Sequence, residues 1–245
     1  MILLEAKELI KRYGGRAVVD RVSFTVSQGE TVGLLGRNGA GKTTTFRMII
    51  GMITPDHGQV VFDGVPVTRT AMYKRARRGM GYLSQEPSVF QRLTVRQNIM
   101  AIMETMNLPR KVRKEKCEQL LEQFGLTSLR SQQAGTLSGG ERRKLEIARA
   151  LVTNPTMILL DEPFSGVDPI AVQDLQREIT GLRDRGISIL LTDHNVRETL
   201  SVTDRSYIID SGKVLREGTP RALINDDLVR RTYLGKTFRG DEFDG

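Results

Sequence analysis

The sequence predicts an α/β fold in which helices cover a parallel sheet, and three observations support this prediction. Between residues 157 and 210, apolar strand patterns alternate with helical patterns. Near the start, a continuous apolar strand at residues 30–36 runs into a glycine-rich turn and then a helix. Residues 94–152 carry long patterns with the helical period and are therefore mostly helical. Strands that alternate with helices favour a parallel sheet with right-handed crossovers.

The individual elements follow from local patterns. Strands are expected at residues 2–9 and 21–33, and a helix at residues 41–50. Residues 58–67 predict a short hairpin that turns at Asp63 and Gly64. The helical middle includes helices at 111–124 and 141–151. The expected order after it is a strand at 157–161, a helix near 169–185, a strand at 187–192, a helix near 195–203 and a strand at 206–210. The acidic end DEFDG is expected to fray.

Length and composition favour an ordinary globular protein. The chain has 245 residues, which favours one compound domain with a sizeable core. It contains no run of about 18 apolar residues, so we expect no membrane-spanning helix. The start, MILLEAKELIKRY, lacks the order of regions that marks a signal peptide. Cys117 is the single cysteine, so an internal disulfide is excluded, and this usage fits a reducing cytosol.

The charge balance is basic, with 37 Lys and Arg against 29 Asp and Glu and a formal net charge of +8. Such a balance admits nucleic acid, anionic lipid or an anionic ligand, but a solvated basic surface is the simpler interpretation. No aromatic-rich nucleic-acid motif accompanies the basic residues, so we expect no nucleic-acid partner. His57 is expected in a turn, without a role. The densest basic stretch comprises Lys74, Arg75, Arg77 and Arg78.

The segment GRNGAGKT at residues 36–43 matches the phosphate-binding pattern G-x-x-x-x-G-K-[ST] at every fixed position. Its glycines let successive backbone N–H groups form a cradle for phosphate oxygens, and the following helix adds its positive end. Lys42 can reach the β- and γ-phosphates, and the Thr43 hydroxyl can bind Mg²⁺. The predicted ATP-binding set in this loop is Arg37, Asn38, Gly39, Ala40, Gly41, Lys42, Thr43 and Thr44.

The apolar strand in the segment MILLDE at residues 157–162 ends in two acidic residues. In a parallel sheet its tip should lie beside the phosphate loop, where ligands bind at the carboxyl ends of strands. We expect Asp161 to orient Mg²⁺ and Glu162 to activate the attacking water as general base. Phosphoryl transfer of this kind needs no covalent nucleophile, so Cys117 is expected to serve packing.

The segment LSGGE at residues 137–141 separates this chain from other phosphate-loop proteins. It resembles the signature sequence of ABC ATPases and matches it in full. Ser138 and the N–H groups of Gly139 and Gly140 stand at a predicted helix N-terminus, which suits an anion. The resemblance implies that this second cradle serves the opposite subunit, so that two ATP molecules are clamped between two chains.

Other residues fall in the order of that family, and their roles come from the resemblance. Tyr13 stands where the family places an aromatic ring against adenine. Gln85 resembles the Q-loop glutamine that contacts Mg²⁺ and the attacking water. Asp168 resembles the aspartate of the D-loop, which crosses the dimer interface. His194 resembles the switch histidine that contacts the γ-phosphate.

The resemblance covers essentially the whole chain and implies a phosphate-loop NTPase (RecA-like) core with an antiparallel β subdomain. The core would comprise residues 1–87 and 154–245, and an inserted helical subdomain would occupy about 88–153. ATP and Mg²⁺ are the implied cofactors. The implied partners are a second copy of the chain and two integral membrane transporter subunits, which contact the transported lipid or solute. The chain would lie on the cytoplasmic face of the inner membrane.

Several stretches are most similar to the ATPases of lipopolysaccharide-export systems. These stretches are residues 76–82, 161–170, 192–200 and 233–238. Ser84, Ser165 and the GDEFDG end depart from that subfamily, and none of them removes a catalytic group. By resemblance, residues just past Gln85 form the groove for a membrane partner, with a packed helix entry as the equal alternative. These groove residues are Phe90, Arg92 and Leu93.

Three other functions compete with this interpretation. The ATPase of a branched-chain amino-acid importer has very similar motifs, and residues 193–200 together with the C-terminal match argue against it. A non-transport ABC protein that acts on DNA or ribosomes usually carries two cassettes or long insertions. A stand-alone phosphate-loop enzyme would have no need of the LSGGE segment.

Overall fold

The computed structural model describes residues 1–235, except for the side chains of Pro169 and Ile170. The predictions for the DEFDG end and for residues 236–238 lie outside the described residues. Within the described part, every helix is too short or too polar to cross a membrane.

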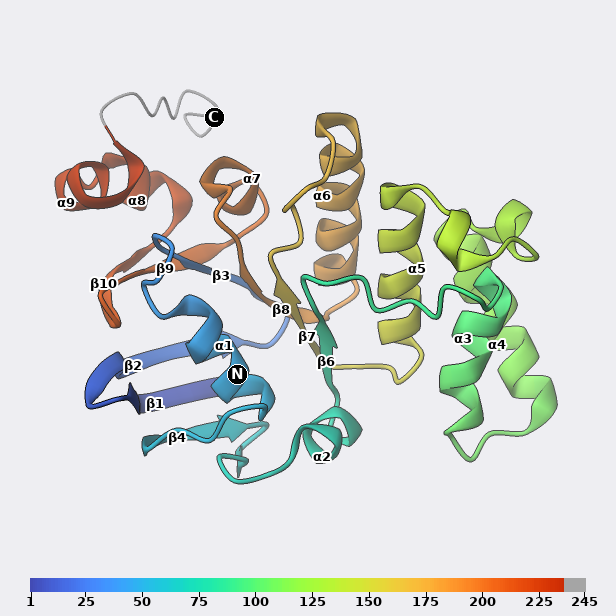
Figure 1. Ribbon diagram of the computed structural model, residues 1–245, viewed down its shortest axis with the longest axis horizontal. Coiled ribbons are helices and arrows are strands. Elements are labelled where there is room, and N and C mark those ends of the chain that lie inside the picture. Colours follow the sequence, from blue (N-terminus) through green and yellow to red (C-terminus); the bar gives the residue numbers. More distant parts are fainter. Residues whose placement is uncertain (236–245) are drawn as a thin grey trace.

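The larger sheet has six strands in the order β10-β9-β3-β8-β7-β6 (Figure 1). Five strands run parallel, and β10 pairs antiparallel with β9 at one edge. This arrangement confirms the predicted parallel α/β core. β3, β7 and β8 are buried at every position, which explains their nearly unbroken apolar sequences. The strands are β3 (Thr31–Leu35), β6 (Met80–Leu83), β7 (Met157–Asp161), β8 (Ser188–Thr192), β9 (Arg205–Asp210) and β10 (Lys213–Gly218).

A second sheet of four antiparallel strands has the order β2-β1-β4-β5. Its strands are β1 (Ile2–Tyr13), β2 (Arg16–Ser27), β4 (His57–Phe62) and β5 (Val65–Pro66). Asp63 and Gly64 turn the predicted β4–β5 hairpin, and both have positive φ, as a tight hairpin turn requires. This sheet confirms the predicted antiparallel β portion.

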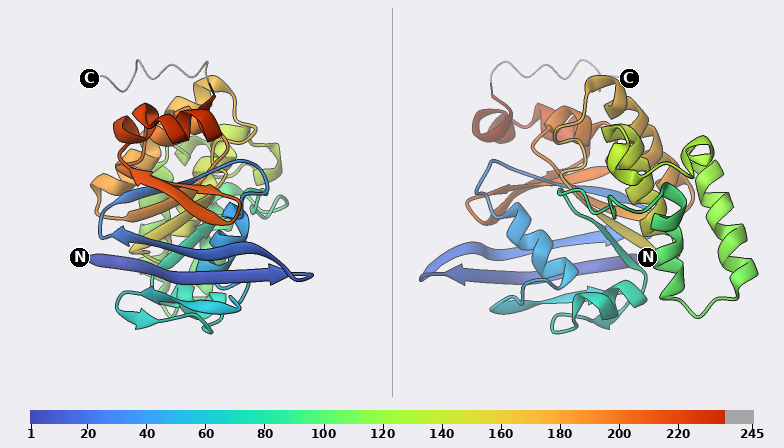
Figure 2. Two further views of the ribbon diagram at one scale, coloured as in Figure 1. Left: turned by 90° about the vertical axis from the view of Figure 1, so that its left-hand side faces the viewer. Right: turned by 45° about the vertical axis from the view of Figure 1, so that its right-hand side comes forward.

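Helix α1 (Lys42–Ile50) packs between the two sheets, where apolar residues of both meet. The helices of the middle region stand to one side of the sheets, as the right-hand view of Figure 2 shows. They are α3 (Val95–Glu104), α4 (Arg110–Gln123) and α5 (Gly139–Leu151), with 3₁₀ turns η1 (Thr127–Leu129) and η2 (Ala134–Thr136). A second apolar core joins them to α6 (Pro169–Asp184) and to β7 and β8. Cys117 is buried in this core, as predicted.

Short helices lie beside the strand that leads into the glycine-rich loop. Leu35, the last residue of β3, shares a third apolar cluster with residues from these helices. The helices are α7 (Val196–Leu200), α8 (Pro220–Asn225), α9 (Asp227–Val229) and the single π-helical turn η3 (Arg230–Leu234).

Some element predictions are wrong in detail. The strand expected at 21–33 is two strands in different sheets, because the chain turns at Gly29, whose φ is +72°. His57 begins β4 and does not lie in a turn. The helix expected at 195–203 is only α7. The sequence analysis did not identify α2 (Met72–Arg77), β6, β10 or the last helices.

The basic stretch also differs from the solvated surface that was expected. Lys74, Arg77 and Arg78 are exposed, but Arg75 is only 1% exposed. Its guanidinium donates to the carbonyls of Met48 and Ile49 at the end of α1, and also to those of Thr68 and Thr70. Burial lowers the pKa of Arg75 to about 10. A cation at the negative end of a helix is favourable, so Arg75 fastens α2 to the helix that follows the phosphate loop.

Candidate functional site

The loop between β3 and α1 depends on two glycines, because a side chain at either position would clash with a backbone carbonyl. A Cβ at Gly36 would lie 2.1 Å from the carbonyl oxygen of Ile209. A Cβ at Gly41 would lie 2.6 Å from the Val18 carbonyl oxygen, and Gly41 has a φ of +103°. The backbone can therefore follow this tight path only without side chains at these positions.

Lys42 is the first residue of α1 and is only 5% exposed. Its Nζ donates to the carbonyl oxygens of Gly36 at 2.6 Å and Arg37 at 3.1 Å. Burial lowers the pKa of Lys42, and the carboxylates of Glu162 and Asp193 oppose that shift. The ammonium group thus bridges the loop and faces a set of acidic groups.

The rest of the loop faces outward. Thr43 is exposed and Thr44 is half-buried. Arg37, Asn38 and Gly39 are also exposed. Ala40 is buried, and its carbonyl accepts from the Gly212 N–H. The loop is therefore anchored on its inner side and accessible on the side where a phosphate would enter.

Asp161 ends β7 on the neighbouring side of the loop and is buried. Burial raises the pKa of its carboxyl, and a hydrogen bond from the Tyr82 hydroxyl at 3.3 Å opposes the shift. The same environment raises the pKa of Tyr82 to about 12, with burial as the main cause. Tyr82 lies in β6, and no pattern in the sequence predicts its contact with Asp161.

Glu162 occupies a strained backbone conformation with a φ of +47°. Its N–H donates to the Thr192 carbonyl at the end of β8, which directs the side chain across the sheet edge. Oε2 of Glu162 accepts from Nε2 of Gln85 at 2.8 Å and lies 3.4 Å from Nδ1 of His194. The structure therefore brings together three residues predicted to be catalytic, from positions far apart in the sequence.

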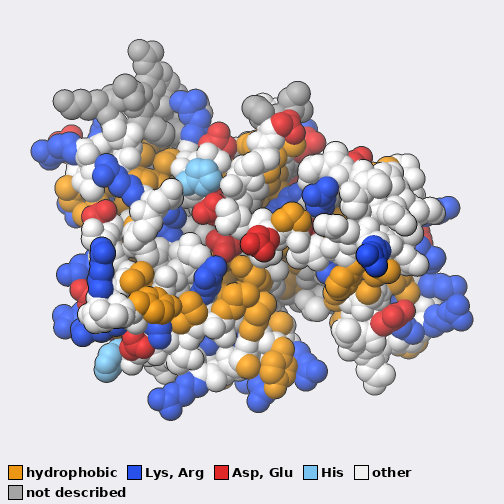
Figure 3. Space-filling model, in the orientation of Figure 1, with side chains coloured by type: hydrophobic (Ala, Val, Ile, Leu, Met, Phe, Trp, Pro, Cys, Tyr) orange, Lys and Arg blue, Asp and Glu red, His pale blue; other side chains and the backbone are white. Residues whose placement is uncertain are grey.

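Asp193 is a further member of this site that the sequence analysis did not assign. It is fully buried, and its carboxylate accepts from the backbone N–H groups of Phe164 and Asn195. Burial raises the pKa of Asp193, and Oδ1 lies 3.5 Å from Nδ1 of His194. The imidazole of His194 thus lies between two carboxylates. Figure 3 shows a histidine and several acidic side chains together near the middle of this face.

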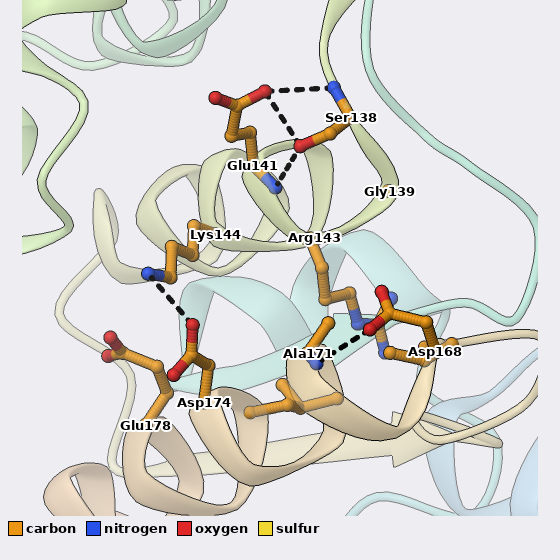
Figure 4. A pocket seen from close by; sticks show the side chains of 12 residues that line it. Ser138, Gly139, Glu141, Arg143, Lys144, Asp168, Ala171, Asp174 and Glu178 are labelled. Atoms are coloured by element: carbon orange, nitrogen blue, oxygen red, sulfur yellow. Dashed lines mark hydrogen bonds and ion pairs between the residues drawn. The ribbon is translucent and has the colours of Figure 1, made fainter.

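The signature segment forms a capped helix start. The Ser138 hydroxyl accepts from the Glu141 N–H, and the Glu141 carboxylate accepts from the N–H and the hydroxyl of Ser138 (Figure 4). Gly139 and Gly140 are the first residues of α5. Among the described residues, no hydrogen bond or ion pair joins residues 138–140 to residues 36–44. The two predicted phosphate cradles thus start different helices, α1 and α5, without a bond between them in the described residues.

Two cavities flank the signature segment. One of about 330 Å³ lies between α5 and α6, with Asp168 and Glu178 in its wall (Figure 4). Asp168 accepts from the Ala171 N–H near the start of α6. The second cavity, of about 370 Å³, is lined by Gln85, Glu162 and the two signature glycines. It connects the catalytic candidates to the helical region.

Helix α5 also holds the loop that follows Gln85. Arg143 donates to the Ser84 carbonyl and pairs with buried Glu146 at 2.9 Å. Glu146 accepts from the Ser88 N–H at 2.7 Å. Arg149 donates to the Ser88 carbonyl. The sequence analysis missed these residues because their partners are backbone groups, which leave no pattern in a sequence.

The predicted partner groove lies next to these contacts. The Phe90 side chain is 47% exposed, and the Arg149 guanidinium lies 4.7 Å from the centre of its ring. Arg92 is exposed and Leu93 is half-buried. Tyr13, the predicted adenine contact, ends β1 and is 49% exposed. These side chains are accessible to a partner or ligand.

The sequence of the chain matches a known protein family. The model of a family described as ABC transporter matches residues 19–165. The chain belongs to the ABC transporter family. The match includes the phosphate loop, Gln85, the signature segment and the Asp161–Glu162 pair.

Curated relatives of this family match nearly the whole chain. The lipopolysaccharide export system ATP-binding protein LptB of Haemophilus influenzae is 52% identical, over 98% of this chain and 100% of that protein. LptB of Escherichia coli (strain K12) is 51% identical with the same coverage. A probable ABC transporter ATP-binding protein of Azorhizobium caulinodans is 54% identical, over 96% of this chain and 84% of that protein. The predicted resemblance to the lipopolysaccharide-export branch of the family is confirmed.

Solved structures support the same fold. The ATP-binding cassette MJ1267 in its ADP conformation has a TM-score of 0.86 and 29% identity, with 96% of this chain and all of that chain covered. A nucleotide-free cassette from an ABC transporter has a TM-score of 0.85 and 29% identity. The ABC ATPase fold predicted from the sequence is therefore confirmed.

Proposed function

We propose that this chain is the ATP-hydrolysing subunit of a membrane transporter and works as a homodimer that encloses two ATP molecules. The observation that carries this proposal is the contact of Gln85 and His194 with one carboxylate oxygen of Glu162. These groups converge beside a buried lysine in a glycine-rich loop, as phosphoryl transfer to water requires.

The residues around the loop fit ATP with Mg²⁺. Backbone N–H groups of residues 37–44 would hold the phosphates, and Lys42 would exchange its carbonyl partners for phosphate oxygens. A cation beside Asp161 would relieve the cost of keeping that buried carboxylate charged, and the exposed Thr43 hydroxyl would be its second ligand. Mg²⁺ would neutralise charge on the phosphate oxygens. Gln85 would contact the cation and the water, and Tyr13 would stack on adenine.

Glu162 is the proposed general base, since its carboxylate is held by Gln85 on one side and faces His194 on the other. The His194 imidazole would contact the γ-phosphate, while buried Asp193 would hold its orientation. Removing one proton from water is the task for which a positioned carboxylate is suited.

The second subunit supplies the other half of each site. Ser138, Gly139 and Gly140 would bind the γ-phosphate of the ATP that is held by the partner's loop, and Asp168 would cross the interface. The start of the two cradles on different helices, α1 and α5, supports this arrangement. Residues 88–153 would act as a helical subdomain that moves relative to a core of 1–87 and 154–245.

Lipopolysaccharide export is the proposed process, on the strength of the two LptB relatives that match over their whole length. The dimer would lie on the cytoplasmic face of the inner membrane below two integral membrane subunits. Phe90, Arg92 and Leu93 would receive a helix from those subunits, and the cargo would contact the membrane subunits.

The test is a pull-down of the tagged chain from its own membranes in mild detergent, together with ATP turnover of the purified complex. We expect two different membrane subunits, bound lipopolysaccharide and magnesium-dependent ATP hydrolysis. Recovery of permease subunits together with an amino-acid-binding protein would indicate that the transporter imports amino acids and does not export lipopolysaccharide. Recovery of DNA or ribosomes without membrane proteins would contradict the transporter assignment.

A further inference from the structure

The last described segment of the chain packs directly behind the phosphate loop. The turn η3 closes with a hydrogen bond from the Gly235 N–H to the Arg230 carbonyl, five residues back. Within it, Tyr233 packs against the apolar cluster that contains Leu35. Leu35 immediately precedes Gly36, so Tyr233 packs against the cluster from which the loop starts. Single π-helical turns are frequent at functional sites.

The hydroxyl of Tyr233 is buried and has no hydrogen-bond partner among the described residues. Burial raises the pKa of Tyr233 to about 12; the N–H of Gly36 lowers it and the charge of Asp193 raises it. The hydroxyl therefore lies near both groups, although its geometry falls short of a hydrogen bond. A buried hydroxyl without a partner destabilises the fold, so a purely packing position would favour phenylalanine.

The polar groups on this side of the loop belong to the proposed catalytic site. Asp193 lies next to His194, and His194 lies next to Glu162. One line of polar groups thus leads from Asp193 through His194 to the proposed general base. The other neighbour, Gly36, accepts from Lys42.

We propose that Tyr233 is a positioning residue, whose hydroxyl accepts a hydrogen bond from the Gly36 N–H when nucleotide fills the loop. This inference rests on the proposed ATPase function. When Lys42 leaves the Gly36 carbonyl for a phosphate, the loop entrance is free to adjust toward Tyr233. The bond then fixes Gly36, and with it the loop that carries Lys42, in the state that hydrolyses ATP.

The experiment compares Tyr233→Phe with the wild-type chain and with Tyr73→Phe. Tyr73 is 58% exposed on α2, so its variant loses the same hydroxyl far from the site. The full-length proteins are assayed for kcat and KM of ATP hydrolysis, for binding of a fluorescent ATP analogue, and for thermal melting.

For Tyr233→Phe we expect kcat to fall about tenfold, the effect of one ordinary hydrogen bond in the transition state. Analogue binding should change less than the rate, and the melting temperature should be equal to or higher than that of the wild type. Tyr73→Phe should match the wild type in all three measurements.

The outcomes separate this inference from the function on which it rests. If the wild-type chain hydrolyses ATP and Tyr233→Phe has the same kcat, the hydroxyl has no positioning role and the inference is wrong. A fall in kcat that comes with a lower melting temperature and weaker binding would indicate general damage and would also overturn it. A wild-type chain that does not hydrolyse ATP overturns the proposed function itself.

Discussion

At the scale of single residues, Glu162 has the most constrained environment in the site. Its backbone is left-handed, its N–H is bonded to Thr192, and its carboxylate contacts Gln85 and His194. Such a conformation costs energy and persists only where the surrounding structure enforces it. The strain therefore agrees with a functional position for this carboxylate.

Replacing Glu162 by Gln should abolish turnover without preventing ATP binding. The amide keeps the size of the side chain but cannot accept a proton, and loss of a general base lowers kcat by about 100-fold or more. Steady-state phosphate release and nucleotide-dependent dimer formation measure the two effects. Glu122→Gln, an exposed change on α4, is the control. Near wild-type turnover in Glu162→Gln would show that another group is the base.

Replacing Arg75 by Met should destabilise the protein by about 2–4 kcal/mol, because four carbonyls lose a charged donor in a buried place. Arg77→Met, an exposed change on the same helix, should alter the free energy of unfolding by less than about 0.5 kcal/mol. Urea unfolding followed by circular dichroism gives both values. Equal effects from the two variants would contradict a specific role for the buried guanidinium.

Predictions of local structure succeeded where spacing along the chain determines that structure. The loop at 36–43 and the cap formed by Ser138 and Glu141 are local, so a short pattern contains them. Arg75 and Asp193 could not be predicted in this way. A charged residue next to other charged residues is usually exposed, and only the folded chain brings backbone carbonyls or N–H groups around it.

At the scale of elements, the bounds of β7 could be predicted from a local pattern, whereas the bounds of β2 and β3 could not. Its bounds were predicted correctly, because Met157–Ile158–Leu159–Leu160 is apolar throughout and ends at a carboxylate. The strand prediction at 21–33 ran across the polar residues 27–30, where Gly29 turns the chain between the alternating β2 and the continuously apolar β3. Antiparallel pairing with β1 decides where β2 ends.

Helix α5 is the element that connects the signature segment to the loop after Gln85. Its residues Arg143, Glu146 and Arg149 hold backbone groups of Ser84 and Ser88. A movement of α5 is therefore transmitted to the segment that carries Phe90, the proposed partner contact. The coupling consists of side-chain hydrogen bonds and not of a continuous helix.

Glu146→Ala should destabilise the protein by about 3–5 kcal/mol, because it leaves half-buried Arg143 without its buried carboxylate partner. The matched control is Glu118→Ala, which removes an exposed ion pair with Arg96 and should cost less than about 1 kcal/mol. Chemical unfolding of both variants measures the difference. A Glu146 variant as stable as its control would mean that α5 does not hold the loop.

At the scale of the whole molecule, the dimer is the proposed functional unit. In one chain Lys42 begins α1 and Ser138 caps α5, and no hydrogen bond or ion pair joins the two among the described residues. In the proposed dimer, each ATP contacts Lys42 and Glu162 of one chain and Ser138 of the other. This arrangement can be tested by mixing inactive variants.

Lys42→Ala and Ser138→Arg should each be inactive alone and should regain ATP turnover when mixed. A mixed dimer has one site with an intact Lys42 from one chain and an intact Ser138 from the other. Lys42→Ala mixed with Glu162→Gln should stay inactive, because both residues act on the ATP held by their own chain. Activity in the second mixture, or none in the first, would contradict the proposed exchange of cradles.

The cap at the start of α5 has a consequence for how two subunits meet. The Glu141 carboxylate already accepts from the N–H and the hydroxyl of Ser138, and these hydrogen bonds lower the pKa of Glu141. The Glu141 carboxylate would therefore compete with an incoming phosphate for the N–H and hydroxyl groups of Ser138. In the proposed dimer, subunit pairing would replace this carboxylate by a phosphate. In the Glu162→Gln background, a further Glu141→Gln change should lower the ATP concentration needed for dimer formation by size-exclusion chromatography. An unchanged ATP requirement would mean that the internal carboxylate does not compete. In the proposed dimer, this internal carboxylate would weaken the attraction of a lone subunit's signature helix for phosphate.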